Sequence, residues 1–224
     1  MTNQININIT KLKNYLNLYA PKKSENKIII DLQIEKKISL KDLGKMIKKG
    51  IILAGGMGTR MSPLTKAVNK QLLPIYDKPL IFYPLSILML AKIKDVLIIV
   101  NKGQLDQYKK IIPNGKNLGI NITYKEQPSP KGLPDAFILG EKFIGKSNVA
   151  LILGDNFFYG QSLTRILKKN TNFKNGAKVF LHPVKNPNLY GVATLNNKNK
   201  VLKLLEKPKK TKSNLAVTLS LIHI

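Results

Sequence analysis

Cysteine is absent from this chain of 224 residues, and histidine occurs only at His182 and His223. Without cysteine there is no disulfide framework, no thiolate nucleophile and no zinc site built on thiolates. Two histidines also argue against a metal centre made of imidazole ligands. We expect His182, which falls in an apolar run, to be structural. The sequence therefore excludes sulfur-based catalysis and disfavours a histidine metal site.

Long hydrophobic runs are missing as well. No apolar segment reaches the roughly 18–20 residues that a membrane-spanning helix needs, and the N-terminus lacks the apolar core of a secretory signal. With 43% apolar residues the chain can still bury a sizeable core. We expect a cytoplasmic protein with no membrane partner.

Acidic residues and arginine are scarce. Twelve Asp and Glu stand against 38 Lys and Arg, which gives a formal net charge of +26, and the only arginines are Arg60 and Arg165. A basic chain suggests nucleic-acid binding, but such surfaces favour arginine for bidentate contacts. The lysines here are also spread along the sequence. We therefore expect no dedicated nucleic-acid binding, only weak attraction to polyanions.

The strongest chemical signal lies in residues 49–78. An apolar run at 50–54 is typical of a buried strand, and it leads into Gly55-Gly56-Met57-Gly58-Thr59-Arg60. Glycines permit positive φ and close approach of a ligand, so that backbone N–H groups can converge on anionic oxygens. Arg60 adds a forked donor and Lys70 a second cation. The loop predicts a phosphate cradle; a glycine-rich turn with incidental charges is the alternative.

This loop is part of a longer pattern. It matches neither the Walker motif nor the dinucleotide fingerprint. Residues 55–65 instead follow G-G-x-G-T-R-[LM]-x-P-[LVI]-T, and residues 70–75 follow K-Q-L-[LV]-P-[IV]. The two motifs resemble those of sugar-1-phosphate nucleotidyltransferases, and residues 76–86 resemble the glucose-1-phosphate thymidylyltransferase branch.

The resemblance implies thymidylyl transfer from dTTP to glucose 1-phosphate, with Mg²⁺ as the cofactor and pyrophosphate as the second product. The alternatives are a sister enzyme that uses another nucleotide or sugar phosphate, and an inactive remnant that only binds nucleotide. Arg60 and Lys70 are implied as catalytic residues that hold phosphates. The implied nucleotide-binding residues of this stretch are Leu53, Gly55, Gly56, Gly58, Thr59, Arg60 and Gln71.

A second motif begins at Gln127. Residues 127–136 are similar to the branch's Q-P-S-P-x-G-L-A-Q-A, with Pro134 and Asp135 departing from it. The resemblance implies that Gln127 and Gly132 contact the base, for which an amide and an accessible backbone are suited. Taken without the resemblance, the segment is a turn that leads into a helix.

A carboxylate follows the apolar run of residues 148–153. Asp155 at the end of a strand could bind Mg²⁺, since hard cations take oxygen ligands, or could cap the helix expected at 162–169. The sequence alone leaves the two open. The resemblance to L-G-D-N-x-[FI]-[FY]-G implies that Asp155 is the metal ligand and also binds nucleotide.

The sugar side of the pattern lies further along. Residues 187–192 match P-x-x-[YF]-G-V and residues 206–208 match E-K-P. A Glu-Lys pair on a hairpin is usually a solvated ion pair. The resemblance instead implies that Lys207 is a third catalytic residue, on the sugar phosphate. The implied sugar-phosphate-binding residues are Tyr190, Gly191, Glu206, Lys207 and Val217.

Strands and helices alternate through the matching region. We expect strands at 50–54, 95–100, 120–124, 148–156 and 178–184, and helices at 79–92, 104–111, 135–143 and 162–169. The first of these helices should bury an apolar face made of Ile87, Leu88, Leu90 and Ala91. This order predicts an α/β protein: a three-layer α/β/α Rossmann-like nucleotidyltransferase fold with a mainly parallel mixed sheet. Ligands then bind at the carboxyl ends of the strands.

The ends of the chain fall outside the resemblance. Residues 1–45 form a non-family extension, poorly ordered or mis-assigned; a real extension with a short strand and a weak helix at 40–47 is the alternative. Residues 46–218 form an incomplete nucleotidyltransferase domain, and residues 219–224 a divergent tail. We expect a truncated gene product that lacks a second metal-binding aspartate. Family members are homo-oligomers, and whether this chain assembles is left open.

Overall fold

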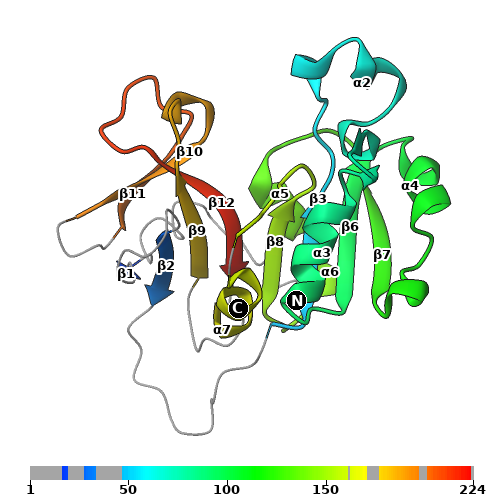
Figure 1. Cartoon of the computed structure of the whole chain (residues 1–224), viewed down its shortest axis with the longest axis horizontal. Helices are drawn as coiled ribbons and strands as arrows, with labels where there is room; N and C mark the ends of the chain where they lie inside the picture. Colours follow the sequence, from blue (N-terminus) through cyan, green and yellow to red (C-terminus); the bar gives the residue numbers. More distant parts are fainter. Residues whose placement is uncertain are drawn as a thin grey trace, which may run out of the picture.

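The computed structural model describes residues 17–19, 28–33, 47–160, 162–170, 177–196 and 201–222. Its centre is a sheet with the strand order β1-β2-β9-β12-β8-β3-β6-β7 (Figure 1). The right-hand part in Figure 1 is parallel throughout and consists of β8 (Val149–Leu153), β3 (Lys49–Leu53), β6 (Asp95–Asn101) and β7 (Asn121–Gln127). These four strands are joined through helices, as the sequence predicts.

The remaining strands pair in the antiparallel sense. They are β9 (Ala177–Pro183), β10 (Gly191–Leu195), β11 (Val201–Glu206), β12 (Leu215–Ile222), β2 (Ile28–Gln33) and β1 (Asn17–Tyr19). Strand β12 lies between β8 and β9 and is antiparallel to both. It therefore joins the parallel part of the sheet to the β9–β11 part.

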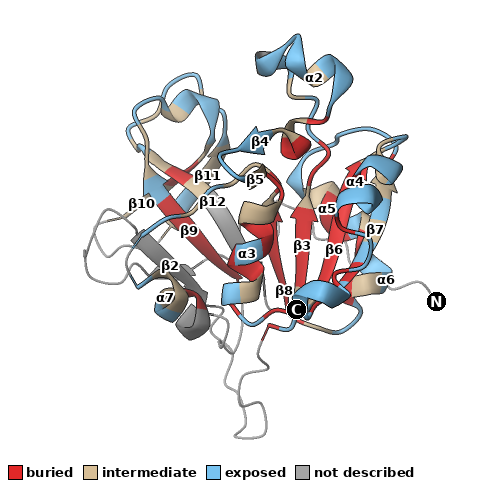
Figure 2. Ribbon diagram, turned by 45° about the vertical axis from the view of Figure 1, so that its right-hand side comes forward, coloured by how far each residue is buried: buried red, intermediate tan, exposed pale blue. Residues whose placement is uncertain are grey.

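Helices cover both faces of the parallel strands. Helices α3 (Phe82–Leu90), α4 (Leu105–Ile111) and α7 (Leu163–Asn170) share one buried cluster, which includes Leu88, Tyr108 and Leu167 together with Ile52 of β3. Helices α5 (Leu133–Leu139) and α6 (Glu141–Ile144) share the other, which includes Ile51 of β3. Since successive strand side chains point to opposite faces, the strand separates two cores (Figure 2). The predicted three-layer α/β/α fold is confirmed.

Two details of the prediction are wrong. The single helix expected at 135–143 is divided into α5 and α6 at Gly140, where a Cβ would lie 2.9 Å from the Ala136 carbonyl oxygen and 3.0 Å from Ile51 Cδ1. The missing side chain lets the chain approach the sheet closely and change direction there. Leu90, expected on the buried face of its helix, is 40% exposed because it lies in the last turn.

Lysine 49 stabilises the end of α6 from the start of β3. Its Nζ donates to the carbonyl oxygens of Phe143 at 2.5 Å and Ile144 at 3.3 Å. Both carbonyls belong to the last turn of α6, where a cation is favourable, and the Ile144 oxygen also accepts the Ser147 N–H at 3.1 Å. The contact fixes the amino end of β3, and with it the direction in which the strand delivers the glycine-rich loop.

Short elements complete the described chain. They are α2 (Leu64–Ala67), the β4–β5 hairpin (Pro74–Ile75 and Lys78–Pro79) and the 3₁₀ turns η2 (Thr59–Met61), η3 (Lys70–Leu72), η4 (Lys116–Leu118) and η5 (Pro187–Leu189). The weak helix considered for residues 40–47 lies outside the described residues, apart from the buried Ile47. No helix in the part of the chain that the structure describes is long and apolar enough to cross a membrane.

Candidate functional site

The predicted base and phosphate residues lie at the carboxyl ends of the parallel strands. The glycine-rich loop follows β3, Gln127 ends β7, and Asp155 comes two residues after β8. The segment with η2, α2 and η3 projects at this end of the sheet (Figure 2). Residues far apart in sequence therefore meet where α/β sheets bind their ligands.

Gln127 is fixed against the glycine-rich loop. Its side chain is 2% exposed, and Nε2 donates to the Gly55 carbonyl oxygen and to Asn101 Oδ1, each at 2.9 Å. A Cβ on Gly55 would lie 1.7 Å from that Nε2. Gly55 is therefore required for the packing of the Gln127 amide, in addition to any contact with a ligand. Sequence reasoning missed Asn101, the last residue of β6, which completes this contact.

The following turn requires glycine for its backbone conformation. Gly58 has φ +62°, and the Thr65 hydroxyl donates to its carbonyl oxygen at 2.9 Å. A Cβ at Gly58 would approach Thr65 Cγ2 to 2.8 Å. Gly56 and Thr59 are exposed at the same end of the sheet, and Arg60 lies on η2, its side chain outside the described atoms. The loop thus presents an open backbone, as a phosphate cradle requires.

Lys70 and Asp155 form an ion pair at the edge of this loop. Lys70 Nζ lies 2.8 Å from Asp155 Oδ2, and the two side chains are 30% and 33% exposed. Lys70 begins η3, and Asp155 follows Gly154, whose N–H donates to the Leu53 carbonyl oxygen at 2.9 Å. A cation and an anion that are 85 residues apart in the sequence are therefore in direct contact.

Gln71 lies beneath the pair. Its side chain is 3% exposed, and within the described residues its Oε1 has no hydrogen-bond partner. A Cβ on Gly154 would lie 2.9 Å from Gln71 Cγ, and one on Gly56 would lie 4.0 Å from Gln71 Nε2. The amide thus lies between the loops that follow β3 and β8. It is an unsatisfied acceptor in the floor of the candidate site.

The predicted sugar-side motifs come together on a hairpin. Gly191 of β10 pairs with Glu206 of β11, and the Lys207 N–H donates to the Tyr190 carbonyl oxygen at 3.0 Å. Lys207 has φ +41°, a left-handed conformation that is costly for a residue with a side chain. Its Nζ is 4.0 Å from Glu206 Oε1, and both side chains are largely exposed. Tyr190, Gly191, Glu206 and Lys207 are therefore neighbours, although two separate motifs supply them.

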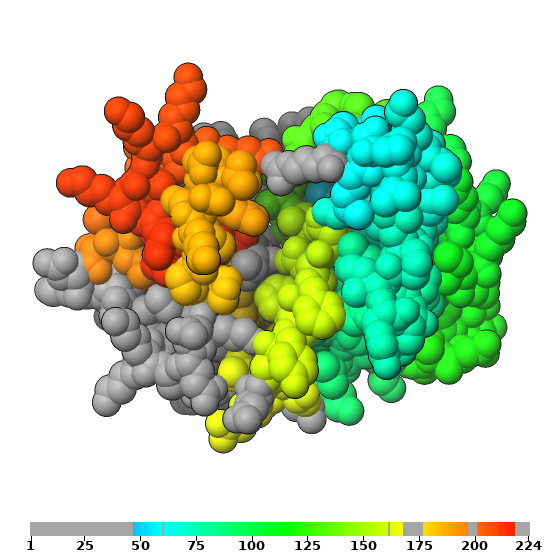
Figure 3. All heavy atoms as spheres, turned by 45° about the horizontal axis from the view of Figure 1, so that its top comes forward, coloured from blue at the N-terminus to red at the C-terminus, as the bar shows by residue number. Residues whose placement is uncertain are grey.

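Strand β12 places this hairpin beside the phosphate residues. It pairs Val192 with Ala216 and, further along, Ile152 with Leu219. Beyond the Leu219–Ile152 pair, β12 has a bulge between Val217 and Leu219, and Val217 lies toward the same end of the sheet as the loop that follows β8. The surface is hollowed between the orange and red atoms of β10–β12 and the cyan atoms of the segment after β3 (Figure 3). The two predicted half-sites thus face a common recess.

A family model described as nucleotidyl transferase matches residues 49–219. The chain belongs to this family. It is 53% identical over 170 residues to a glucose-1-phosphate thymidylyltransferase of Neisseria meningitidis, and 46% identical over 169 residues to one of Mycolicibacterium smegmatis. These matches cover 76% and 75% of this chain but 59% and 58% of the relatives. The chain therefore spans less than two thirds of the length of the curated relatives it matches.

Solved structures in the family have the same fold. One assigned as a glucose-1-phosphate thymidylyltransferase of Bacillus anthracis, in complex with sucrose, has a TM-score of 0.73 and 39% identity, over 78% of this chain and 71% of that one. A UDP-glucose pyrophosphorylase complexed with UDP-glucose has a TM-score of 0.64 and 26% identity, over 80% and 76%. The predicted resemblance to sugar-1-phosphate nucleotidyltransferases is confirmed.

Asp155 fits a metal ion as part of a shared coordination shell. Mg²⁺ in such sites is commonly held by one or two carboxylates together with substrate phosphates. Nowhere among the described residues do three or more His, Asp or Glu gather as a metal cluster. A single, partly exposed carboxylate beside a phosphate cradle suits a cation whose other ligands come from the nucleotide and from water.

A buried polar network that sequence reasoning missed holds the Lys70 turn in place. Asn69 is 4% exposed, and its Oδ1 accepts the Gln71 N–H at 3.0 Å and the Tyr108 hydroxyl at 2.8 Å. The same hydroxyl lies 3.3 Å from the Ala54 carbonyl oxygen. Tyr108 thereby connects helix α4 to the start of the glycine-rich loop at Ala54 and to the start of the Lys70 turn at Asn69. A polar-tipped aromatic residue on a predicted helix is the one signal that could have suggested it.

We expect Tyr108→Phe to destabilise the fold and to change its response to alkali. Loss of the buried hydroxyl removes a hydrogen-bond donor from Asn69 Oδ1 and from the Ala54 carbonyl oxygen. The free energy of unfolding should fall by about 1–1.5 kcal/mol. Burial raises the pKa of Tyr108 above its ordinary value of 10, whereas the unfolded tyrosine ionises near that value. Above about pH 10 the unfolded state therefore binds fewer protons, and the free energy of unfolding falls as pH rises.

Urea unfolding of both proteins between pH 8 and pH 11 measures this effect. The wild type should lose stability more steeply above pH 10 than the Phe variant. Burial of Tyr124, whose pKa is raised to about 12, contributes equally to both proteins. Parallel curves for the two would contradict the assignment to Tyr108.

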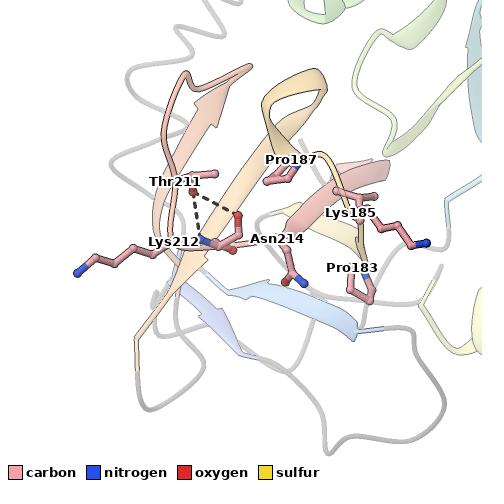
Figure 4. Close-up of a pocket in the computed structure, with 8 residues that line it drawn as sticks. Pro183, Lys185, Pro187, Thr211, Lys212 and Asn214 are labelled. Carbon is pink, nitrogen blue, oxygen red and sulfur yellow. Dashed lines mark hydrogen bonds between the residues drawn. The ribbon is translucent and has the colours of Figure 1, made fainter.

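Gly132, Leu53 and His182 are three other residues singled out in the sequence. Gly132 precedes α5 with φ +95°, Leu53 ends β3 half-buried, and His182 is exposed on β9. An open hollow of about 460 Å³ lies beside the β9–β10 connection (Figure 4). Its two lysine side chains extend in opposite directions, and no predicted site residue lines it. The hollow is lined by Pro183, Val184, Lys185, Pro187, Thr211, Lys212, Ser213 and Asn214.

Proposed function

We propose that this protein transfers the thymidylyl group of dTTP to glucose 1-phosphate and releases pyrophosphate. The observation that carries the proposal is that residues of three separate motifs meet at the carboxyl ends of the parallel strands. Gln127 hydrogen-bonds to Gly55 across 72 residues, and Lys70 pairs with Asp155 across 85. The similarity to thymidylyltransferases of two organisms supports the choice of dTTP and glucose 1-phosphate as substrates.

The chemistry needs positioning and charge neutralisation. A phosphate oxygen of glucose 1-phosphate attacks the α-phosphorus of dTTP, and the bond from that phosphorus to the bridging oxygen of the β-phosphate breaks as pyrophosphate leaves. No covalent protein intermediate is required. The protein contributes by holding the two substrates in line and by placing cations near the phosphates.

Each half of the recess takes one substrate. Gln127 and Gly132 face the thymine, the backbone of Gly55, Gly56, Gly58 and Thr59 faces the phosphates, and Leu53 and Gln71 line the nucleotide floor. Arg60 holds the departing pyrophosphate and Lys70 the reacting phosphates. Tyr190, Gly191, Glu206 and Val217 hold the sugar, and Lys207 neutralises its phosphate. Asp155 is the residue that would hold Mg²⁺, which when bound neutralises charge on phosphate oxygens.

The direct test is to incubate this chain with dTTP, glucose 1-phosphate and Mg²⁺ and to measure dTDP-glucose and pyrophosphate. Formation of both products supports the proposal. No product in the presence of measurable dTTP binding would indicate that the chain retains the nucleotide site without turnover, and the proposed activity would be abandoned.

A nucleotide-competition assay separates the proposal from a sister activity. The similarity to a UDP-glucose pyrophosphorylase makes UTP the relevant competitor. Thymine and uracil present the same hydrogen-bonding edge to Gln127, so discrimination has to come from the C5 methyl of thymine and from the 2′-hydroxyl of UTP. We expect dTTP to bind about tenfold more tightly than UTP, which is what one methyl group in a fitted pocket contributes. Equal or tighter binding of UTP would argue for the sister activity.

A further inference from the structure

We propose that Lys70 blocks the metal-binding carboxylate of Asp155 until a nucleotide triphosphate arrives. In the absence of nucleotide the protein then binds divalent cations poorly, and the triphosphate opens the metal site by drawing Lys70 onto its own oxygens. This inference rests on the proposed function, because it takes the triphosphate as the ligand that displaces Lys70.

Lys70 and Asp155 are in direct contact. Lys70 Nζ stands 2.8 Å from Asp155 Oδ2, so the ammonium group occupies the space in which a metal ion would approach that oxygen. Both partners are held by the backbone: Asn69 caps the turn that starts at Lys70, and the Asn156 N–H donates to the Leu153 carbonyl oxygen at 3.1 Å. The contact is therefore set by two fixed loops.

Asp155 has no cluster of further carboxylates beside it that could take its place as a metal ligand. The described residues contain no group of three potential ligands, and Glu206, the other carboxylate of the candidate site, lies on the sugar-side hairpin. A divalent cation and the Lys70 ammonium compete for the same oxygen and repel each other when close. In the free protein a divalent cation thus meets a carboxylate that is already paired with Lys70, and the Lys70 ammonium repels it.

A nucleotide triphosphate can compete with Asp155 for the Lys70 ammonium. A triphosphate presents several anionic oxygens, which form stronger charge-assisted hydrogen bonds with an ammonium than one partly exposed carboxylate does. The open glycine-rich loop places these oxygens beside Lys70: a Cβ on Gly58 would lie 3.2 Å from Lys70 Cβ. Transfer of Lys70 from Asp155 to the phosphates then exposes the carboxylate at the moment when the metal's other ligands arrive.

The test uses Mn²⁺ alone as the probe, titrated into nucleotide-free protein and followed by the electron paramagnetic resonance signal of unbound Mn²⁺. We expect Lys70→Met to bind Mn²⁺ about three- to tenfold more tightly than the wild type, since a competing cation is removed from a partly exposed pair. Lys70→Arg keeps the charge and should behave as the wild type. Asp155→Asn placed in the Lys70→Met protein should abolish the gain.

Two results on the free protein would overturn the inference. One is an Mn²⁺ affinity that is unchanged or weaker in Lys70→Met; the other is a gain that survives Asp155→Asn. Because both side chains of the pair are partly exposed, Lys70→Met should fold normally, and a thermal-unfolding midpoint close to that of the wild type checks this.

Metal-free dTTP binding, measured by calorimetry, separates failure of this inference from failure of the proposed function. Wild-type protein should bind dTTP, and Lys70→Met should bind it more weakly. Binding of dTTP by the wild type, without an Mn²⁺ gain in Lys70→Met, rejects the blocking role alone. Absence of dTTP binding by the wild type rejects the proposed function, and with it the triphosphate as the displacing ligand.

Discussion

Gly55→Ala is expected to lower the affinity for dTTP by about ten- to a hundredfold, which corresponds to the loss of one or two buried hydrogen bonds. The added Cβ would lie 1.7 Å from Gln127 Nε2 and 2.9 Å from Asn101 Oδ1, so the Gln127 amide has to leave its position. The base contact is then lost and a buried polar group is left without partners. Isothermal calorimetry with dTTP measures the effect.

A double-mutant cycle tests whether the effect acts through Gln127. In a Gln127→Ala background the two shortest contacts of the added Cβ are gone and only Asn101 Oδ1 at 2.9 Å remains, so Gly55→Ala should weaken dTTP binding much less than in the wild type. Gly56→Ala is the folding control, because its Cβ would be 4.0 Å from the nearest heavy atom and displaces no internal side chain. Equal losses from Gly55→Ala in both backgrounds would show that the glycine acts independently of Gln127.

Lys207→Ala is expected to reduce turnover by two or more orders of magnitude while the protein stays folded. The Lys207 side chain is 60% exposed on the sugar-side hairpin, so folding does not depend on its charge. Neutralising a reacting phosphate in a recess, by contrast, is a transition-state contribution of several kcal/mol. Measuring kcat for dTDP-glucose formation gives the loss of transition-state stabilisation. Measuring the affinity for glucose 1-phosphate gives the loss of substrate binding.

The backbone at this position supplies a sharper control. Because Lys207 has φ +41°, Lys207→Gly removes the cation and also relieves the backbone strain. That variant should gain about 1 kcal/mol of stability and still be as inactive as Lys207→Ala. Lys209→Ala, a change of equal charge at a neighbouring exposed lysine, should leave turnover near the wild-type value. Loss of activity in Lys209→Ala alone would transfer the role to that lysine.

The fold class could be predicted from local patterns. The apolar runs that become β3, β6 and β8 are short, rich in β-branched residues and separated by helical segments, so a parallel sheet with helices on both faces follows from chain connectivity. The break at Gly140 could not be predicted, because its cause is the side chain of Ile51 on a strand almost 90 residues away.

By itself the sequence determined the residues available for chemistry: no thiol, two histidines, a glycine-rich loop, and lysines and carboxylates in ordered motifs. Local chemistry sets these choices, since a turn that needs positive φ or a strand that is buried restricts its own residues. Only the tertiary structure decided which of them meet. Three contacts join parts of the chain that are far apart in sequence: Gln127 with Gly55, Lys70 with Asp155, and Asn69 with Tyr108. Their geometry is fixed by the packing of four parallel strands, which no local pattern encodes.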